Sequence, residues 1–229
     1  MPNEMVEFKS NGATAEGYLA VPESGSGPGI IVIQEWWGLV PHIKNVCERF
    51  AAEGFVALAP DLYHGRTTTS PDEAGKLMMA LNIEQAEKDL RGAIEYLLAH
   101  ESVKGERAGT VGFCMGGALS LYAASKNERV GACVVFYGGH PKVAPDLENM
   151  RAPLLGLYAE RDDFATPALA RELEAKLKSL GKSAEIHVYD DADHAFFNDD
   201  RPEVFNAKAA TDAWQRALRF LREHLSEQA

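Results

Sequence analysis

The chain has 229 residues, 46% hydrophobic and 9% aromatic, so it can bury a core without disulfides or a structural metal. Its 34 acidic and 23 basic residues give a net charge of −11. This balance argues against nucleic acid or an anionic membrane as a partner, because both bind basic patches. Disordered, collagen-like and disulfide-rich classes are excluded, and we expect one domain over residues 1–229.

The longest apolar run, residues 29–33, is far shorter than the roughly 20 residues that span a bilayer, and the acidic N-terminus lacks a signal-peptide core. The three cysteines, Cys47, Cys114 and Cys133, lie far apart without CxxC spacing, which favours free thiols in a reducing compartment. We therefore expect a cytoplasmic protein, either a monomer or a small homo-oligomer.

Short runs of valine, isoleucine and leucine alternate with amphipathic segments, a pattern typical of a parallel sheet with crossover helices. An edge hairpin is expected first, at residues 6–8 and 17–21, and a turn follows it at 22–29. Further strands are expected at residues 29–34, 54–60, 108–113, 132–138, 152–159 and 184–190. Helices are expected at about 41–53, in two segments of 71–100, directly after 113, within 167–180 and at about 202–225. The predicted fold class is α/β, with a mostly parallel central sheet flanked by helices on both faces.

Reactive side chains follow four of the predicted strands, namely Glu35, Cys114, Asp162 and His194. In open α/β sheets, ligands bind outside the carboxyl ends of the strands. These four residues are therefore the first candidates for a site.

Residues 112–117, Gly-Phe-Cys-Met-Gly-Gly, match the nucleophile elbow GxSxG with cysteine in place of serine. The glycines leave room where a strand turns sharply into a helix. The helix N-terminus would favour a thiolate at Cys114, and the Met115 N–H is a candidate oxyanion donor. The alternatives are a buried apolar cysteine or a phosphate-binding turn, but the Walker lysine and the full GxGxxG are missing.

Partners for the cysteine follow in the chain order nucleophile, acid, histidine. His194 would be the general base, and Asp162, preferred to Asp163, would fix its tautomer. Taken alone, His194 could be a surface loop histidine among acidic residues, and Asp162 could be a turn or helix-capping residue. Their joint occurrence at successive strand ends favours a catalytic triad.

No HExxH motif, histidine pair or cysteine cluster indicates a metal, so we expect neither metal nor cofactor. His64 and His140 are weak candidates to line the crevice, and most other histidines, His42 included, are expected to be structural or solvated. The acidic residues at 190–194 and 198–200 could attract a cation, but we interpret them as a solvated loop.

Over nearly its whole length the sequence resembles the dienelactone hydrolases, which have the α/β-hydrolase fold. The resemblance rests on Gly-Tyr-Leu-Ala-Val-Pro at 17–22, Gln-Glu-Trp-Trp-Gly at 34–38, Ala-Pro-Asp-Leu-Tyr-His-Gly at 59–65, the cysteine elbow, the Asp162 segment and Asp-Ala-Asp-His-Ala-Phe at 191–196. It implies that Glu35 contacts the resting cysteine and helps to form the thiolate. It also implies that the Trp36 N–H completes the oxyanion hole.

The position of Glu35 is itself unusual, because it directly follows an apolar strand and precedes two tryptophans. A desolvated carboxylate there would be a usable proton acceptor. The alternative is a carboxylate that caps the next helix or pairs with an arginine.

The sequence departs from the family where arginines bind the carboxylate of dienelactone. One arginine is expected four residues after the histidine, where this chain has Asn198, and residues 67–90 contain no arginine. Arg66 and Arg201 are candidate replacements. We expect a more apolar pocket, suited to neutral esters or lactones. The predicted substrate-binding residues are Trp37, Tyr137, Phe196 and Asn198.

The predicted function is a cofactor-free cysteine hydrolase, a carboxylic ester hydrolase that opens small-molecule lactones or esters through an acyl-thioester. A broader carboxylesterase, a thioesterase or a phosphotriester hydrolase could use the same residues. A non-catalytic α/β-hydrolase binding module would predict a broken triad, and the sequence keeps all three members.

Overall fold

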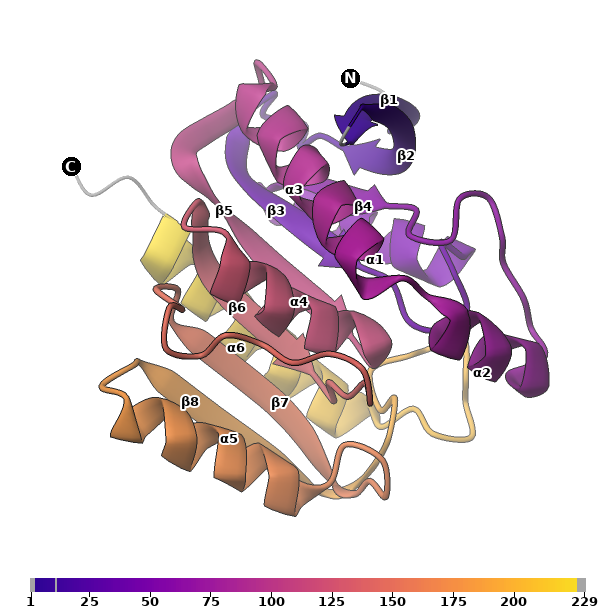
Figure 1. Ribbon diagram of the computed structural model, residues 1–229, viewed down its shortest axis with the longest axis vertical. Helices are drawn as coiled ribbons and strands as arrows, with labels where there is room; N and C mark the ends of the chain where they lie inside the picture. Colours follow the sequence, from indigo (N-terminus) through magenta and orange to yellow (C-terminus); the bar gives the residue numbers. More distant parts are fainter. Residues whose placement is uncertain (1–2, 11, 226–229) are drawn as a thin grey trace.

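The computed structural model describes residues 3–10 and 12–225. Its centre is an eight-stranded sheet in the order β1-β2-β4-β3-β5-β6-β7-β8 (Figure 1). The strands are β1 (Glu4–Ser10), β2 (Ala13–Ala20), β3 (Gly27–Ile33), β4 (Val56–Pro60), β5 (Val103–Phe113), β6 (Val130–Phe136), β7 (Leu154–Arg161) and β8 (Ala184–Asp193). The helices are α1 (Pro41–Ala52), α2 (Pro71–Ala80), α3 (Ile83–Ala99), α4 (Met115–Lys126), α5 (Pro167–Ser179) and α6 (Ala207–Leu225).

Strand direction follows the expected pattern. Strand β2 runs antiparallel to both β1 and β4. The remaining neighbours in the sheet, in the order β4-β3-β5-β6-β7-β8, all pair in parallel. Every residue of β4 and β6 is buried, as expected for parallel strands covered on both faces. The edge hairpin and the mostly parallel α/β sheet are both confirmed.

Helices cover both faces of the sheet. Figure 1 shows α3, α4 and α5 in front of it and α1 and α6 behind it. The two rear helices touch, because the rings of Phe50 in α1 and Trp214 in α6 lie 4.3 Å apart between centroids. Helices α1, α3, α4, α5 and α6 pack against the strands, so the core lies as two layers, one on each face of the sheet.

The last helix begins later than expected, at Ala207 rather than near Pro202. The side chain of Asn206 accepts a hydrogen bond of 3.1 Å from the Ala209 N–H, and this cap sets the start of the helix. Residues 201–206 form turns instead. The prediction was wrong here because proline is compatible with either a first helical turn or a loop.

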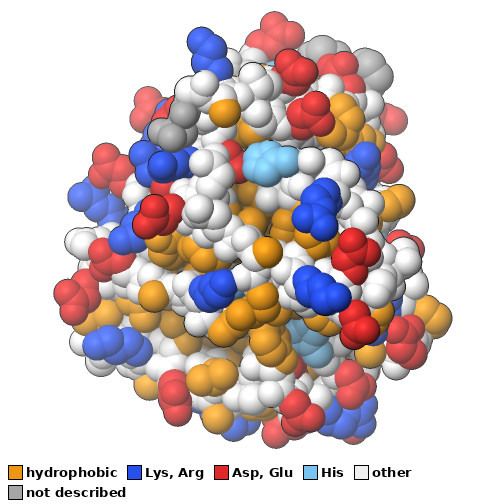
Figure 2. Space-filling model, turned by 45° about the vertical axis from the view of Figure 1, so that its right-hand side comes forward, with side chains coloured by type: hydrophobic (Ala, Val, Ile, Leu, Met, Phe, Trp, Pro, Cys, Tyr) orange, Lys and Arg blue, Asp and Glu red, His pale blue; other side chains and the backbone are white. Residues whose placement is uncertain are grey.

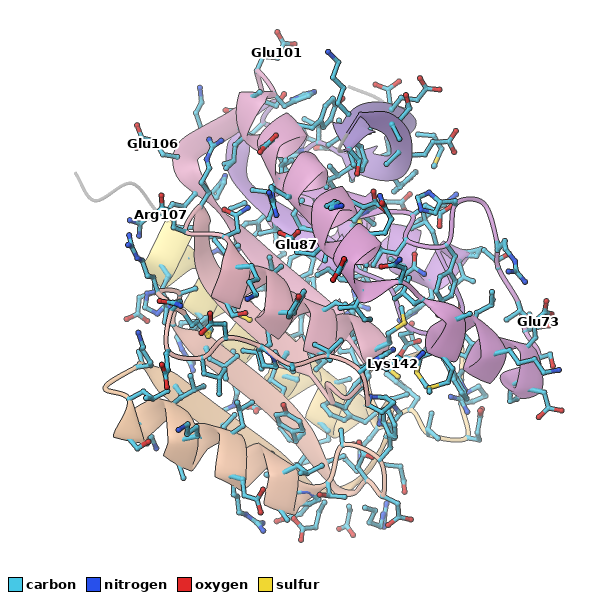
Figure 3. All side chains as sticks on the ribbon, viewed as in Figure 1. Glu73, Glu87, Glu101, Glu106, Arg107 and Lys142 are labelled. Carbon is cyan, nitrogen blue, oxygen red and sulfur yellow. The ribbon has the colours of Figure 1, made fainter. Side chains whose placement is uncertain are left out.

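The surface carries charges of both signs. On the face in Figure 2, hydrophobic side chains gather near the middle and are bordered by basic and acidic ones. Figure 3 shows Glu101, Glu106 and Arg107 pointing away from the sheet at one end of the molecule. None of the helices in the described residues is both long and apolar enough for a membrane span.

Candidate active site

Four strands end beside one cavity of about 460 Å³, at the carboxyl edge of the parallel sheet. Glu35 follows β3, Cys114 follows β5, Asp162 follows β7 and His194 follows β8, and all four line this cavity. Residues far apart in the sequence meet here because neighbouring parallel strands end on the same side.

Cys114 occupies a strained turn between β5 and α4, with φ of 53° and ψ of −120°. The residues two positions before and after Cys114 must be glycine: a Cβ on Gly112 would lie 1.9 Å from the carbonyl oxygen of Gly116, and one on Gly116 would lie 2.3 Å from that of Ile33. The thiol is only 6% exposed, yet it borders the cavity. The turn therefore presents the sulfur to a small molecule while its backbone stays packed.

Asp162 is the acid that faces the histidine. Its Oδ2 lies 2.6 Å from Nδ1 of His194, and its Oδ1 accepts hydrogen bonds from the N–H groups of Phe164 (2.8 Å) and Ala165 (2.9 Å). Asp163, the other candidate, lines the cavity without contacting the ring. Each oxygen of Asp162 is thus engaged, and Nε2 of the imidazole is left for the cavity side.

The hydrogen bonds of His194 decide its protonation. Burial alone would lower the pKa of the imidazole, but the hydrogen bond with Asp162 and the interaction with Cys114 outweigh burial and raise the pKa to about 10. For Asp162, burial acts to raise the pKa, and the bonds from His194 and two backbone N–H groups hold it below its usual value. These interactions favour the protonated imidazole of His194 at neutral pH.

The carboxylate of Glu35 is buried and held by two donors. Nδ2 of Asn198 lies 2.6 Å from Oε2, and the Tyr137 hydroxyl lies 3.4 Å from Oε1. Burial, and then the charge of Glu35, raise the pKa of Tyr137 well above its ordinary value, so the hydroxyl stays a donor. The expected resting contact between Glu35 and Cys114 is not among the hydrogen bonds of the described residues, in which the Glu35 carboxylate pairs with Tyr137 and Asn198.

The expected substrate residues divide into two groups. Trp37 lines the cavity beside Trp36, and their ring centroids lie 4.9 Å apart. Tyr137 and Phe196 are fully buried and pack on each other at 5.3 Å, and Asn198 is buried against Glu35, so these three support the site from beneath rather than line it. Met78, Phe164 and Val204 add apolar walls to the cavity, and no motif in the sequence marks them.

Two guanidinium groups reach the cavity. Arg201 lies over the Trp37 ring at 5.6 Å, and Arg161, which was not among the expected candidates, donates a hydrogen bond to Asp193 at 3.2 Å. Arg66, the other expected candidate, lies outside this cavity near Glu73. In a single sequence, an arginine at the end of a strand is only a weak indication of a cavity residue. Only the loop geometry shows that Arg161 reaches the cavity and Arg66 does not.

Residues 15–225 match the sequence model of the dienelactone hydrolase family. The chain belongs to this family. Two curated relatives are "Protein usf" of Aquifex pyrophilus, 38% identical over 97% of this chain and 99% of the relative, and a "Putative carboxymethylenebutenolidase" of Aquifex aeolicus, 34% identical over 97% and 99%. A crystal structure of a "Putative Dienelactone Hydrolase" from Klebsiella pneumoniae has a TM-score of 0.86 and 29% identity over 97% of this chain and 100% of that one.

The α/β-hydrolase fold and the family resemblance inferred from the sequence are thereby confirmed. This dienelactone hydrolase family member is a carboxylic ester hydrolase. The family match spans all four cavity residues described above, from Glu35 to His194.

Proposed function

We propose that the protein hydrolyses carboxylic esters or lactones through an acyl-thioester on Cys114. The observation that carries this proposal is the place of Cys114 and His194 on the wall of one cavity, where Nδ1 of His194 lies 2.6 Å from Oδ2 of Asp162. A nucleophile, a base and a residue that orients the base are the parts that acyl transfer needs.

In the first step, Sγ of Cys114 attacks the substrate carbonyl carbon, a C–S bond forms, and the carbonyl π electrons move to the oxygen. The tetrahedral intermediate then collapses, the C–O bond to the leaving alcohol breaks, and His194 gives that oxygen a proton. Water attacks the thioester while His194 takes one of its protons, and the carboxylic acid leaves as the thiolate is restored.

The developing oxyanion would be held by the N–H groups of Met115 and Trp36. Met115 is the first residue of α4, so its N–H has no partner inside the helix. The start of α4 and the end of β3 are in close contact, since a Cβ on Gly116 would lie 2.4 Å from the Gln34 carbonyl oxygen. This packing brings the backbone after β3, including Trp36, to the same end of the cavity.

Glu35 is the second proton acceptor that we propose near the sulfur. Its carboxylate lines the cavity with Cys114, and the amide of Asn198 and the hydroxyl of Tyr137 fix its orientation. In this role, Glu35 accepts the thiol proton as substrate enters, and Asn198 is a positioning residue.

We propose a neutral substrate. The walls carry Trp36, Trp37 and other apolar side chains. Both guanidinium groups at the cavity already have acidic partners, since Arg201 lies 2.8 Å from Glu203, and Arg161 bonds Asp193. A substrate carboxylate would have to compete with these acids for its hydrogen bonds.

The test is steady-state hydrolysis of a neutral aryl ester and of anionic dienelactone by the wild type and by Cys114→Ala. We expect the neutral ester to be preferred, and Cys114→Ala to lose about 10³-fold or more in kcat. Cys47→Ala is the control, because Cys47 is buried in α1 away from the cavity. Rapid quenching and mass spectrometry should find the acyl group on Cys114.

Turnover by Cys114→Ala at the wild-type rate would refute the thioester route. A preference for dienelactone that disappears in Arg201→Gln would refute the neutral substrate and assign carboxylate binding to Arg201 instead.

A further inference from the structure

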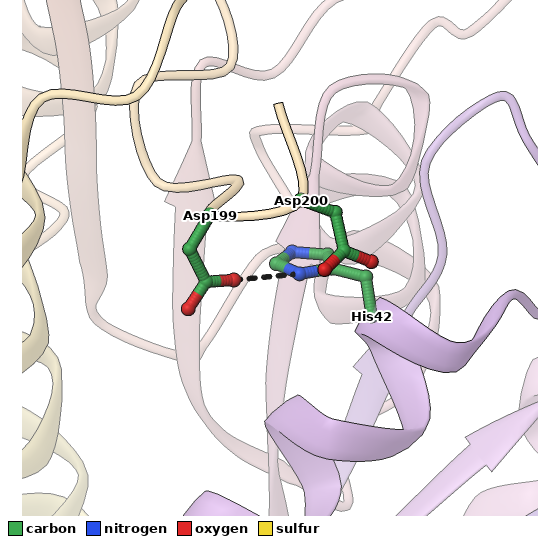
Figure 4. A group of neighbouring side chains, drawn as sticks. All are labelled: His42, Asp199 and Asp200. Atoms are coloured by element: carbon green, nitrogen blue, oxygen red, sulfur yellow. Dashed lines mark ion pairs between the residues drawn. The ribbon is translucent and has the colours of Figure 1, made fainter. Parts of the chain in front are cut away.

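His42 is a buried histidine that the catalytic arrangement does not use. It lies in the first turn of α1, is 3% exposed, and has no hydrogen bond at either ring nitrogen within the described residues. Its Nδ1 lies 3.1 Å from Oδ1 of Asp199, an ion-pair distance without hydrogen-bond geometry (Figure 4). Buried polar groups nearly always have a hydrogen-bond partner, so a buried imidazole without one indicates a missing ligand.

Two carboxylates converge on this ring from the loop after His194. The donor atoms of His42, Asp199 and Asp200 all lie within 4.8 Å of one another. Figure 4 shows the two acids on either side of the imidazole. The Asp199 side chain is 47% exposed, and Asp200 is also exposed, so both carboxylates can rotate toward a common ligand.

One cation already lies near the cluster. Nη1 of Arg49 is 3.7 Å from Oδ2 of Asp199, and its guanidinium is held over the rings of Phe197 (4.8 Å) and Trp214 (4.7 Å). Arg49 therefore faces the Asp199 oxygen that is turned away from His42, and it balances one of two carboxylate charges. The remaining negative charge is available to a cation.

We propose that His42, Asp199 and Asp200 bind a divalent transition-metal ion of the zinc type. One imidazole nitrogen and two carboxylate oxygens form a three-ligand set, and water supplies the fourth position. A small inward rotation of the exposed carboxylates would bring the donors from within 4.8 Å to tetrahedral spacing. Magnesium and calcium fit poorly, because they prefer all-oxygen sites.

The bound ion would join α1 to the loop that carries Asn198. The N–H of Asp200 donates to Oδ1 of Asn198 at 3.1 Å, and the Asn198 amide holds Glu35. The ion would thus stabilise the position of Asn198, which holds Glu35, without contacting the cavity. The metal site does not rest on the proposed hydrolysis, and either can fail alone.

The experiment is calorimetric titration of the metal-stripped protein with ZnCl₂, with each variant compared in a Cys114→Ala background because the active-site thiol can itself bind zinc. We expect one saturable site and a higher Tm with zinc. His42→Ala, Asp199→Asn and Asp200→Asn should each weaken binding by about tenfold or more, since each removes a ligand. His187→Ala is the matched control, because His187 pairs with Glu185 on another part of the surface.

Cobalt(II) gives a second readout, since its visible bands report coordination number and a thiolate ligand adds a charge-transfer band. Four-coordinate bands without that charge-transfer band support the site. The Tm measured without metal shows whether each variant folds. If His42→Ala does not fold, the Asp199→Asn variant, whose side chain is exposed, still tests the site. The proposal is overturned by no saturable zinc binding, by equal binding in all variants, or by calcium binding as tightly as zinc.

Discussion

At the scale of single residues, the elbow shows how steric demand and reactivity depend on each other. Cys114 adopts a positive φ that costs a non-glycine residue energy, and it does so because β5 and α4 meet at a contact that only glycine allows. The conformation that exposes the sulfur to the cavity is therefore maintained by Gly112 and Gly116.

Gly116→Ala should cost about 3 kcal/mol in the free energy of unfolding, because its Cβ would overlap the backbone oxygens of Ile33 and Gln34. Gly75→Ala is the matched control, since a Cβ there in α2 would meet only the Trp36 ring at 3.9 Å. Alanine should be neutral or slightly stabilising at Gly75. Urea denaturation measures both changes, and equal effects would contradict the steric argument.

His194 should make stability depend on pH. Its pKa is raised in the folded state from the usual 6.5 to about 10, so its contribution is complete below pH 6.5 and is lost as pH rises through 10. The difference in free energy of unfolding between the wild type and His194→Gln should therefore be largest near about pH 6 and shrink toward about pH 10. Denaturant titrations at several pH values test this, and a constant difference would argue against the raised pKa.

At the scale of elements, strand ends place the chemistry and helix starts fix the loops. The segment between His194 and α6 carries Asn198, which holds the Glu35 carboxylate, and Arg201, which lines the cavity. Asn206 closes this segment: its Oδ1 accepts from the Ala209 N–H, and its Nδ2 donates to the Asp191 carbonyl at 3.2 Å. A helix cap here also ties the loop to the end of β8.

Asn206→Ala should lower the free energy of unfolding by about 1 kcal/mol, because the first turn of α6 loses its side-chain acceptor. Asn206→Ser keeps an acceptor at the cap and should recover most of that loss. Thermal or urea unfolding of the two variants distinguishes them. If serine destabilises as much as alanine, the bond to Asp191 rather than the cap carries the effect.

At the scale of the whole molecule, burial separates three cysteines of identical chemistry. Cys47 in α1 and Cys133 in β6 are fully buried, and burial raises the pKa of Cys133 to about 11 and that of Cys47 further. Cys114 alone of the three borders the active-site cavity, which His194 also lines. The fold thus protects two thiols and presents one.

Iodoacetamide at neutral pH should therefore alkylate one thiol in the folded protein and all three after unfolding. The native label should be on Cys114, found by peptide mass spectrometry, and folded Cys114→Ala should take up almost none. Equal, slow labelling of the three cysteines would indicate an unactivated Cys114 and favour a binding module without catalysis.

Much of this arrangement could be predicted because its signals are local. Alternating apolar and amphipathic runs predicted the parallel sheet, and the glycines around Cys114 predicted the strand-to-helix turn, since each depends on neighbours in sequence. The order of Cys114, Asp162 and His194, each just after a predicted parallel strand, then placed them at one edge. Asp162 could not be separated from Asp163 by pattern, because adjacent aspartates differ only in which one the loop turns toward the ring.

Other features depend on contacts between distant parts of the chain, which a single sequence does not encode locally. Asn198 meets Glu35 across 163 positions, so its role on that carboxylate rather than at the substrate emerged only in the structure. Arg161 reaches the cavity, and His42 meets Asp199, for the same reason. Secondary structure follows from nearest-neighbour geometry, whereas these pairings follow from strand order and the course of the loops, which are set by packing of the whole domain.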